Sequence, residues 1–109
     1  EKIYLEVKSA VLRKEKYAMY PDCPSSRGRK HIRELTKHAK EGGNASILFI
    51  AGLFGVEGFR PNRSADPEIY KLLQEAYRSG VNIRSIGVYY NLEDSYIYLF
   101  NPDLKVNLS

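Results

Sequence analysis

The stretch ASILFIA at residues 45–51 is apolar over nearly its whole length. It has the length of a strand, and a strand without polar alternation is typical of one covered on both faces of a sheet. Gly42 and Gly43 precede it and Gly52 follows it, so turn-forming residues mark both of its ends. We predict that this stretch is the central strand of the fold.

An amphipathic helix is predicted before this strand and another after it. The first begins at Ser25 or Ser26, either of which can cap it, and ends at the glycine pair. The second begins at Asp66-Pro67-Glu68, where an acid caps the helix, proline suits its first position and a second acid favours the dipole. The apolar residues at helical spacing are Ile32, Leu35 and Ala39 in the first helix, and Ile69, Leu72, Leu73, Ala76 and Tyr77 in the second, which ends at Gly80.

Two strands are predicted before the first helix. Apolar and polar residues alternate from Ile3 onward, which indicates a half-buried strand that runs to about Leu12. The charged residues 13–16 then form a turn, and residues 17–20 form a short strand that ends at Pro21.

Two more strands are predicted after the second helix, at residues 81–90 and 96–100, joined by a turn at 91–94 and followed by a polar tail. Residues 52–65, which contain three glycines, are predicted to be a long loop. The order β-β-α-β-α-β-β predicts an α/β fold with a mixed central sheet flanked by a helix on each face.

The composition is that of a compact protein of the cell interior. The 109 residues suffice for one domain, residues 1–109, and no apolar run approaches the roughly 20 residues that span a bilayer. Cys23 has no partner for a disulfide and no signal-peptide pattern is present, so we expect a reducing, cytoplasmic location. Because a strand pattern begins immediately after Glu1, we expect the chain to be a fragment of a longer protein.

Most of the net charge of +4 comes from one segment. Between residues 27 and 40 the cations are Arg27, Arg29, Lys30, Arg33, Lys37 and Lys40, accompanied by His31 and His38 and opposed by Glu34 alone. A helix start also offers free backbone N–H groups and a positive dipole end to an anion. We predict that nucleic-acid phosphates contact Arg27, Arg29, Lys30, His31 and Arg33. A basic face that serves only solubility is the alternative.

The triplet Glu6-Val7-Lys8 carries the clearest chemical signal. On a strand, Glu6 and Lys8 point to one face while Val7 points to the core. A carboxylate can bind a hard divalent cation, and a neighbouring lysine can orient an attacking water or stabilise charge on a phosphate, as metal-dependent phosphodiester cleavage requires. An ion pair on an exposed strand face is the alternative.

A second carboxylate, Asp22, lies between Pro21 and Pro24 shortly before the basic helix. Glu6 and Asp22 are the candidate ligands of Mg²⁺ or Mn²⁺, and Glu6, Lys8 and Asp22 are the candidate catalytic residues. A turn role for Asp22 is the alternative, since acids beside proline often serve turns. Tyrosines of the last two strands either stack on bases or cover an open sheet face. They are Tyr89, Tyr90, Tyr96 and Tyr98.

Three motifs follow one another in a fixed order. They are Glu6-Val7-Lys8, then Tyr20-Pro21-Asp22-Cys23-Pro24, then RGRKHIREL at residues 27–35. Their order and spacing resemble E-V-K, F-P-D-A and R-G-x-K-H-L-x-E-L of the sugar fermentation stimulation protein family. The likeness continues through residues 47–50, residues 59–61 and the start of the second helix, so it covers nearly the whole chain.

The resemblance implies a C-terminal domain with a restriction-endonuclease-like PD-(D/E)XK core, partial in this sequence, which follows an N-terminal OB-like domain in complete members. Glu6 and Lys8 would be the second acid and the lysine of the nuclease motif, near Asp22 and the basic helix start. Non-specific DNA binding and a role in regulating sugar (maltose) metabolism are also implied. A metal-dependent nuclease acting on DNA or RNA is the alternative function, so whether the chain is an enzyme stays open. A domain that binds an acidic protein is a third hypothesis.

Overall fold

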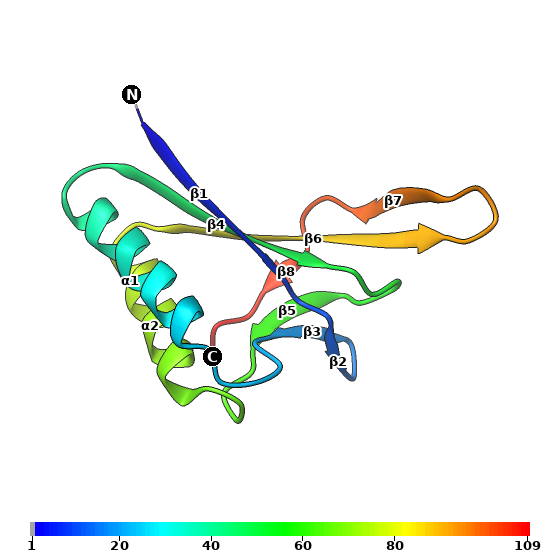
Figure 1. The fold of residues 1–109 in the computed structure, drawn as a ribbon, viewed down its shortest axis with the longest axis horizontal. Helices are drawn as coiled ribbons and strands as arrows, with labels where there is room; N and C mark the ends of the chain where they lie inside the picture. Colours follow the sequence, from blue (N-terminus) through cyan, green and yellow to red (C-terminus); the bar gives the residue numbers. More distant parts are fainter. Residues whose placement is uncertain (1) are drawn as a thin grey trace.

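The computed structural model describes residues 2–109 and shows two β-sheets and two helices in this part of the chain (Figure 1). The elements, in chain order, are β1 (Ile3–Ser9), β2 (Leu12–Lys14), β3 (Tyr17–Tyr20), α1 (Ser26–Lys40), β4 (Asn44–Ala51), β5 (Gly58–Pro61), α2 (Pro67–Arg78), β6 (Asn82–Asn91), β7 (Tyr96–Asn101) and β8 (Lys105–Val106). The predicted mixed α/β class is therefore confirmed, but the predicted single sheet is wrong.

The first sheet has the strand order β1-β4-β6-β7. Strands β1, β4 and β6 are parallel, and β7 pairs antiparallel with β6. The interior position predicted for residues 45–51 is confirmed. Coverage on both faces is not: Ile47 and Phe49 are buried on one face, whereas Leu48 and Ile50 on the other face are only half-buried.

The second sheet has the order β2-β3-β5-β8 and is built from short strands. The chain passes from the first sheet to the second at Ala10, which is fully buried and donates its backbone N–H to the carbonyl of Ile50 at 2.9 Å. The predicted first strand is thus two strands in different sheets. Because β2 already occupies residues 12–14 and pairs with β3, the turn is shorter than predicted.

Two strands lie where none was predicted. The predicted loop 52–65 contains β5, and the predicted polar tail contains β8. Phe59 is the main apolar anchor of β5, and its neighbours are glycine, arginine and proline, so no alternation marks the strand. The strand forms because Phe59 is completely buried and because β3 and β8 supply its backbone partners.

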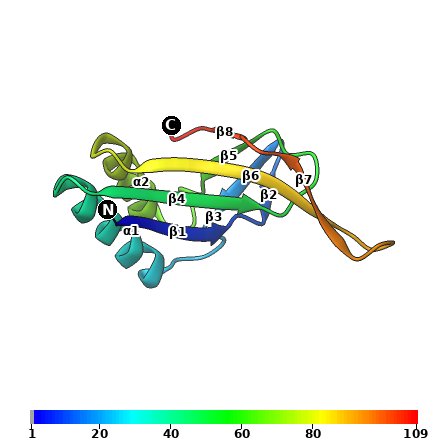
Figure 2. The ribbon, with the colours of Figure 1, turned by 90° about the horizontal axis from the view of Figure 1, so that it is seen from above.

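Both helices begin at predicted caps. The side chain of Ser25 accepts a hydrogen bond from the N–H of Gly28, and that of Asp66 accepts one from Ile69. The two helices lie side by side on one face of the first sheet, together with the second sheet (Figure 2). The predicted placement of one helix on each face is therefore wrong. Neither helix in residues 2–109 has the length and apolar character needed to cross a membrane.

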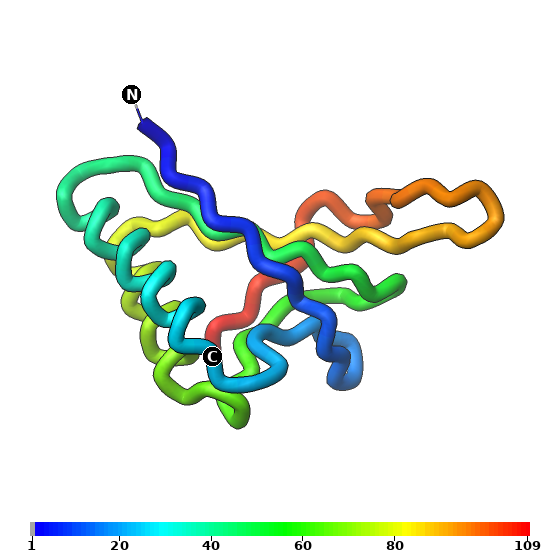
Figure 3. The backbone as a smooth tube through the Cα atoms, viewed as in Figure 1, coloured from blue at the N-terminus to red at the C-terminus, as the bar shows by residue number. Residues whose placement is uncertain are grey.

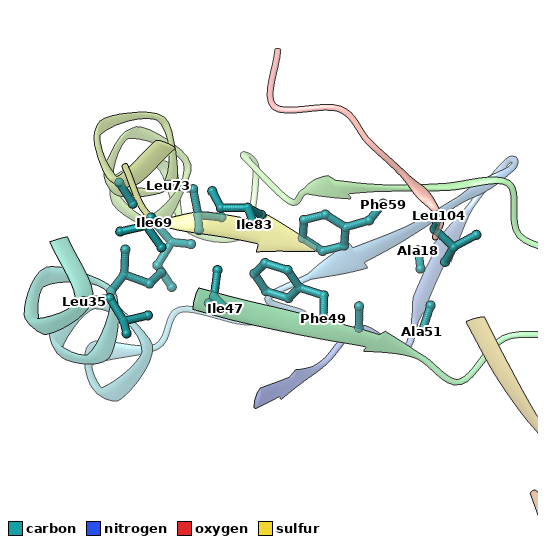
Figure 4. Packing of buried hydrophobic residues seen from close by; sticks show 14 of the residues in the cluster. Ala18, Leu35, Ile47, Phe49, Ala51, Phe59, Ile69, Leu73, Ile83 and Leu104 are labelled. Carbon is teal, nitrogen blue, oxygen red and sulfur yellow. The ribbon is translucent and has the colours of Figure 1, made fainter. Parts of the chain in front are cut away.

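The core lies between the first sheet and the layer formed by the helices and second sheet. The rings of Phe49 and Phe59 stack with their centroids 4.0 Å apart, and Leu35 from α1 and Ile69 and Leu73 from α2 belong to the same buried cluster (Figure 4). Burial of each large apolar side chain contributes on the order of 2 kcal/mol. This shared core explains why both helices lie on the same face.

The opposite face of the first sheet is open and apolar. Ile3, Leu5 and Val7 of β1 have 68%, 59% and 49% of their surface exposed, so the prediction that Val7 points to the core is wrong. The alternation was identified correctly, but it is the polar residues of β1 that face α1. Ile97 and Leu99 continue the exposed surface onto the hairpin of β6 and β7, which extends away from the body of the molecule (Figure 3).

Candidate functional site

Three polar side chains meet between β1 and the first turns of α1. The Nζ atom of Lys8 lies 3.2 Å from Oε2 of Glu6 and 2.8 Å from Nδ1 of His31. The same Oε2 lies 3.1 Å from Nδ1 of His31. The three side chains are 14% to 29% exposed, so the cluster is partly shielded and still reachable from solvent.

The register of β1 with β4 places this cluster next to buried apolar residues. Glu6 is the Cα partner of Ile47, and Lys8 is the partner of Phe49, in the parallel pairing of β1 with β4. Ile47 and Phe49 are at most 1% exposed, so the charged groups sit at the edge of the core. Charge interactions are stronger at such a position than in open water.

The Nδ1 atom of His31 lies within hydrogen-bonding distance of both a cation and an anion. When Nδ1 carries no proton it accepts a hydrogen bond from Lys8, and when Nδ1 is protonated it donates to Glu6. One nitrogen cannot make both bonds at once. Which of the two bonds forms depends on the tautomer of His31.

A pocket of about 400 Å³ lies beside the cluster, between β1 and α1. Glu6 and His31 line it together with Glu34, which is exposed on α1. From the sequence alone, Glu34 is notable only as the one acid within the basic segment at residues 27–40. Its position three residues after His31 places both on one helix face, and this spacing was the signal that could have found it.

Tyr20 is a second residue that sequence reasoning missed. A Cβ atom at Gly28 would lie 2.3 Å from the Tyr20 hydroxyl, so glycine is required for α1 to approach this tyrosine. Burial raises the pKa of Tyr20, and the charges of Glu6, Asp66 and Asp22 raise it further, although a hydrogen bond with Ser25 acts in the opposite direction. The hydroxyl thus stays protonated and able to donate to an anion.

Asp22 lies in the exposed loop between β3 and α1, after the cis peptide bond between Tyr20 and Pro21. Its charge, like that of Glu6, raises the pKa of Tyr20. Residues 2–109 bring no group of three or more His, Cys, Asp or Glu side chains together as a metal site. Of the two predicted metal ligands, Glu6 lies in the cluster with Lys8 and His31.

Arg29 ties the starts of the two helices together. Its guanidinium lies 2.5 Å from Oδ2 of Asp66, which is only 3% exposed and also accepts the N–H groups of Ser25 and Ile69 at 3.0 Å. Burial alone would raise the pKa of Asp66, but these hydrogen bonds and the Arg29 charge outweigh it and lower the pKa. The Arg29 guanidinium is therefore already engaged by a carboxylate in the folded chain.

The predicted phosphate-binding residues thus fall into two groups. Arg33 lies 4.0 Å from Glu68, and Lys40 lies 2.8 Å from Glu75, so acids of α2 also oppose cations along α1. Arg27 and Lys30 are exposed and form no ion pair with a carboxylate within residues 2–109. They are the cations of the helix start that remain available to a phosphate.

Comparison with known proteins gives consistent matches along the chain. The family described as "Sugar fermentation stimulation protein RE domain" matches residues 1–94. A sugar fermentation stimulation protein homolog of Pyrococcus furiosus is 51% identical over 96 residues, which cover 88% of this chain and 42% of that protein. A homolog of Archaeoglobus fulgidus is 48% identical over 103 residues, which cover 94% of this chain and 45% of that protein.

A solved structure is also similar. "The structure of Pyrococcus Furiosus SfsA in complex with Ca2+" matches with a TM-score of 0.93 and 48% identity. The match covers 96% of this chain and 45% of that chain. The present chain therefore spans less than half the length of these relatives.

Proposed function

Since this chain belongs to the sugar fermentation stimulation protein family, as its motifs predicted, we propose that it is a DNA-binding domain that contacts the phosphate backbone without sequence specificity. The start of α1 is the contact surface. Arg27 and Lys30 bind phosphate oxygens there, and Lys8 and His31 lie beneath them at the edge of the core.

One observation carries this proposal: Arg27 and Lys30 at the start of α1 are exposed and form no ion pair within residues 2–109, while Arg29 is held by Asp66. Phosphate contacts give affinity without sequence information, because the backbone is the same for every base pair. Exposed groups at the surface of a helix can reach a backbone, and nothing in their placement selects a base. Non-specific binding therefore fits the geometry.

Binding of labelled duplexes of two unrelated sequences, followed by fluorescence anisotropy over a series of salt concentrations, tests this function. We expect equal affinities for the two sequences and a linear fall of log K with log salt. The double variant Arg27→Gln, Lys30→Gln should reduce the slope by about 1.8, that is about 0.9 for each lost contact. Lys40→Gln, Arg84→Gln is the matched control, because it removes two cations that are paired with Glu75 and Asp103. Equal slopes for the two double variants would contradict the proposal.

A divalent-metal-dependent nuclease on a PD-(D/E)XK core is the second candidate. The specific observation in its favour is the convergence of Glu6, Lys8 and His31 beside a pocket. In this role Lys8 stabilises charge on the phosphate, and His31 holds or releases a proton beside it. The Pyrococcus furiosus structure with Ca²⁺ supports a divalent ion in the family, since Ca²⁺ and Mg²⁺ both take oxygen ligands. Glu6 would be one ligand and Asp22 a candidate for another.

Cleavage of labelled single- and double-stranded DNA and of RNA, with Mg²⁺ or Mn²⁺ and with a chelator, tests the second candidate. Lys8→Ala should reduce the cleavage rate about 100-fold or more, because it removes a group that stabilises transition-state charge. Glu6→Gln should lower the rate and weaken the response to the metal. Cleavage at the wild-type rate in Lys8→Ala would rule out this assignment, while the anisotropy measurement would still report on DNA binding.

Regulation of sugar (maltose) metabolism would be a consequence of DNA binding at the cell level. Non-specific contacts alone do not choose a gene, so such regulation requires occupancy of many sites. Measurement of sugar-gene transcription in cells with the wild-type protein and with Arg27→Gln, Lys30→Gln tests it. Equal transcript levels would show that DNA binding by Arg27 and Lys30 does not regulate these genes.

A further inference from the structure

The outer face of the second sheet carries a row of residues in register across all four strands. Lys14 of β2 is the Cα partner of Tyr17 in β3, Tyr17 is the partner of Gly58 in β5, and Gly58 is the partner of Lys105 in β8. Paired residues project to the same face of a sheet. The opposite face holds Phe59 in the core, so this row points away from the core.

The Tyr17 ring lies against Gly58. A Cβ atom at Gly58 would be 3.0 Å from the ring and 2.8 Å from the backbone oxygen of Lys105, so only glycine leaves the space that the ring uses. The guanidinium of Arg60 lies 5.2 Å from the ring centroid, and the Lys16 ammonium lies 5.8 Å from it. Both distances suit a cation–π contact, which restrains the two cations around one aromatic platform.

Within residues 2–109, the four cations around Tyr17 form no ion pair with a carboxylate. They are Lys14, Lys16, Arg60 and Lys105. The acids of this end, Glu15 and Glu57, lie in the segments just before β3 and β5, outside the row. The face is therefore a concentrated, unpaired positive surface.

We propose that this face, defined by Lys14, Lys16, Tyr17, Arg60 and Lys105, is a second contact surface for the phosphodiester backbone of nucleic acid. The inference rests on the proposed DNA binding and extends its footprint beyond α1. Strand β3 runs from Tyr17 on this face to Tyr20, and the loop at residues 21–25 then leads to the start of α1. The two surfaces are therefore carried by consecutive elements of the chain.

Lys16 and Arg60 are restrained by the ring, so they lose less freedom on binding than isolated surface cations do. Affinity from this face should depend on charge and salt rather than on sequence.

The test compares three double variants in the same anisotropy titration with duplex and with single-stranded DNA. Lys16→Gln, Arg60→Gln should reduce the duplex salt slope by about 1.8 and the single-strand slope by about 1.4, from about 0.9 and 0.7 for each contact. Lys40→Gln, Arg84→Gln is the paired-cation control and should leave both slopes unchanged. Lys14→Gln, Lys105→Gln removes two exposed cations of the same face, so it tests the surface without removing the cations that contact the Tyr17 ring.

The outcomes separate the two proposals. Lower slopes in both platform variants support the second surface, and a loss in only one strand form identifies the nucleic acid that reaches it. Slopes equal to the control in both platform variants overturn the inference, while a reduced slope in Arg27→Gln, Lys30→Gln still supports binding at α1. If wild type itself shows no salt-dependent binding, the proposed function fails and the second surface fails with it.

Discussion

The start of α1 and the outer face of the second sheet are both rich in cations, but their cations have different neighbours. Along α1, acids of α2 oppose three cations, because the two helices lie side by side. Around Tyr17, no carboxylate within residues 2–109 forms an ion pair with the cations, and an aromatic ring restrains Lys16 and Arg60 instead. A count of charges along the sequence therefore overestimates the number of α1 cations that can bind phosphate. It also overlooks the cations of the second sheet. Packing decides which charges are available.

The largest effect is expected at Asp66, where the helix starts are joined. Asp66→Ala removes the α2 cap, the bond to the Ser25 N–H and the partner of Arg29, so we expect the free energy of unfolding to fall by about 3 kcal/mol. Urea denaturation measures it. Asp66→Asn, which keeps a capping oxygen, should lose less. Equal losses in the two variants would show that the charge contributes nothing.

The same pair should give the stability a pH dependence in acid. The pKa of Asp66 is lower in the folded chain than in the unfolded chain, so its contribution is present above the unfolded value of about 4 and is lost as pH falls through the folded value. The difference in unfolding free energy between wild type and Asp66→Asn should therefore shrink between pH 6 and pH 2, roughly the range that brackets these values. A constant difference across that range would contradict the lowered pKa.

The smallest effect is expected at the exposed pair of Arg33 and Glu68. Their charged atoms are 4.0 Å apart and both side chains are more than half exposed. Arg33→Ala should therefore change the free energy of unfolding by less than about 0.5 kcal/mol. A loss as large as that of Asp66→Ala would mean that the whole interface between α1 and α2 depends on its ion pairs rather than on its apolar core.

The features that could be predicted from the sequence are those that depend on residues close together along the chain. Ser25 and Asp66 were identifiable as caps because a capping side chain bonds to a backbone N–H three residues away. Glu6 and Lys8 were placed on one face because a strand has a period of two. The family motifs were also recognisable in the sequence, because their residues are close together along the chain.

What the sequence could not provide depends on contacts between distant segments. Arg29 and Asp66 are 37 positions apart, and Lys8 and His31 are 23 apart, so neither contact leaves a local pattern. Strand β5 was missed because one buried Phe59 between glycine and proline makes no periodicity. The prediction of which face of β1 is buried was wrong because the covered side of an alternating strand depends on where α1 packs.

The most direct test of the account is a nuclear magnetic resonance titration that follows arginine Nε–H and lysine Nζ signals while a duplex is added. We predict that the signals of Arg27, Lys30, Lys16 and Arg60 shift together, while those of Arg29 and Lys40 stay in place because their carboxylate partners hold them. Shifts confined to the paired cations, or spread equally over all of them, would contradict the claim that pairing selects the residues that bind phosphate.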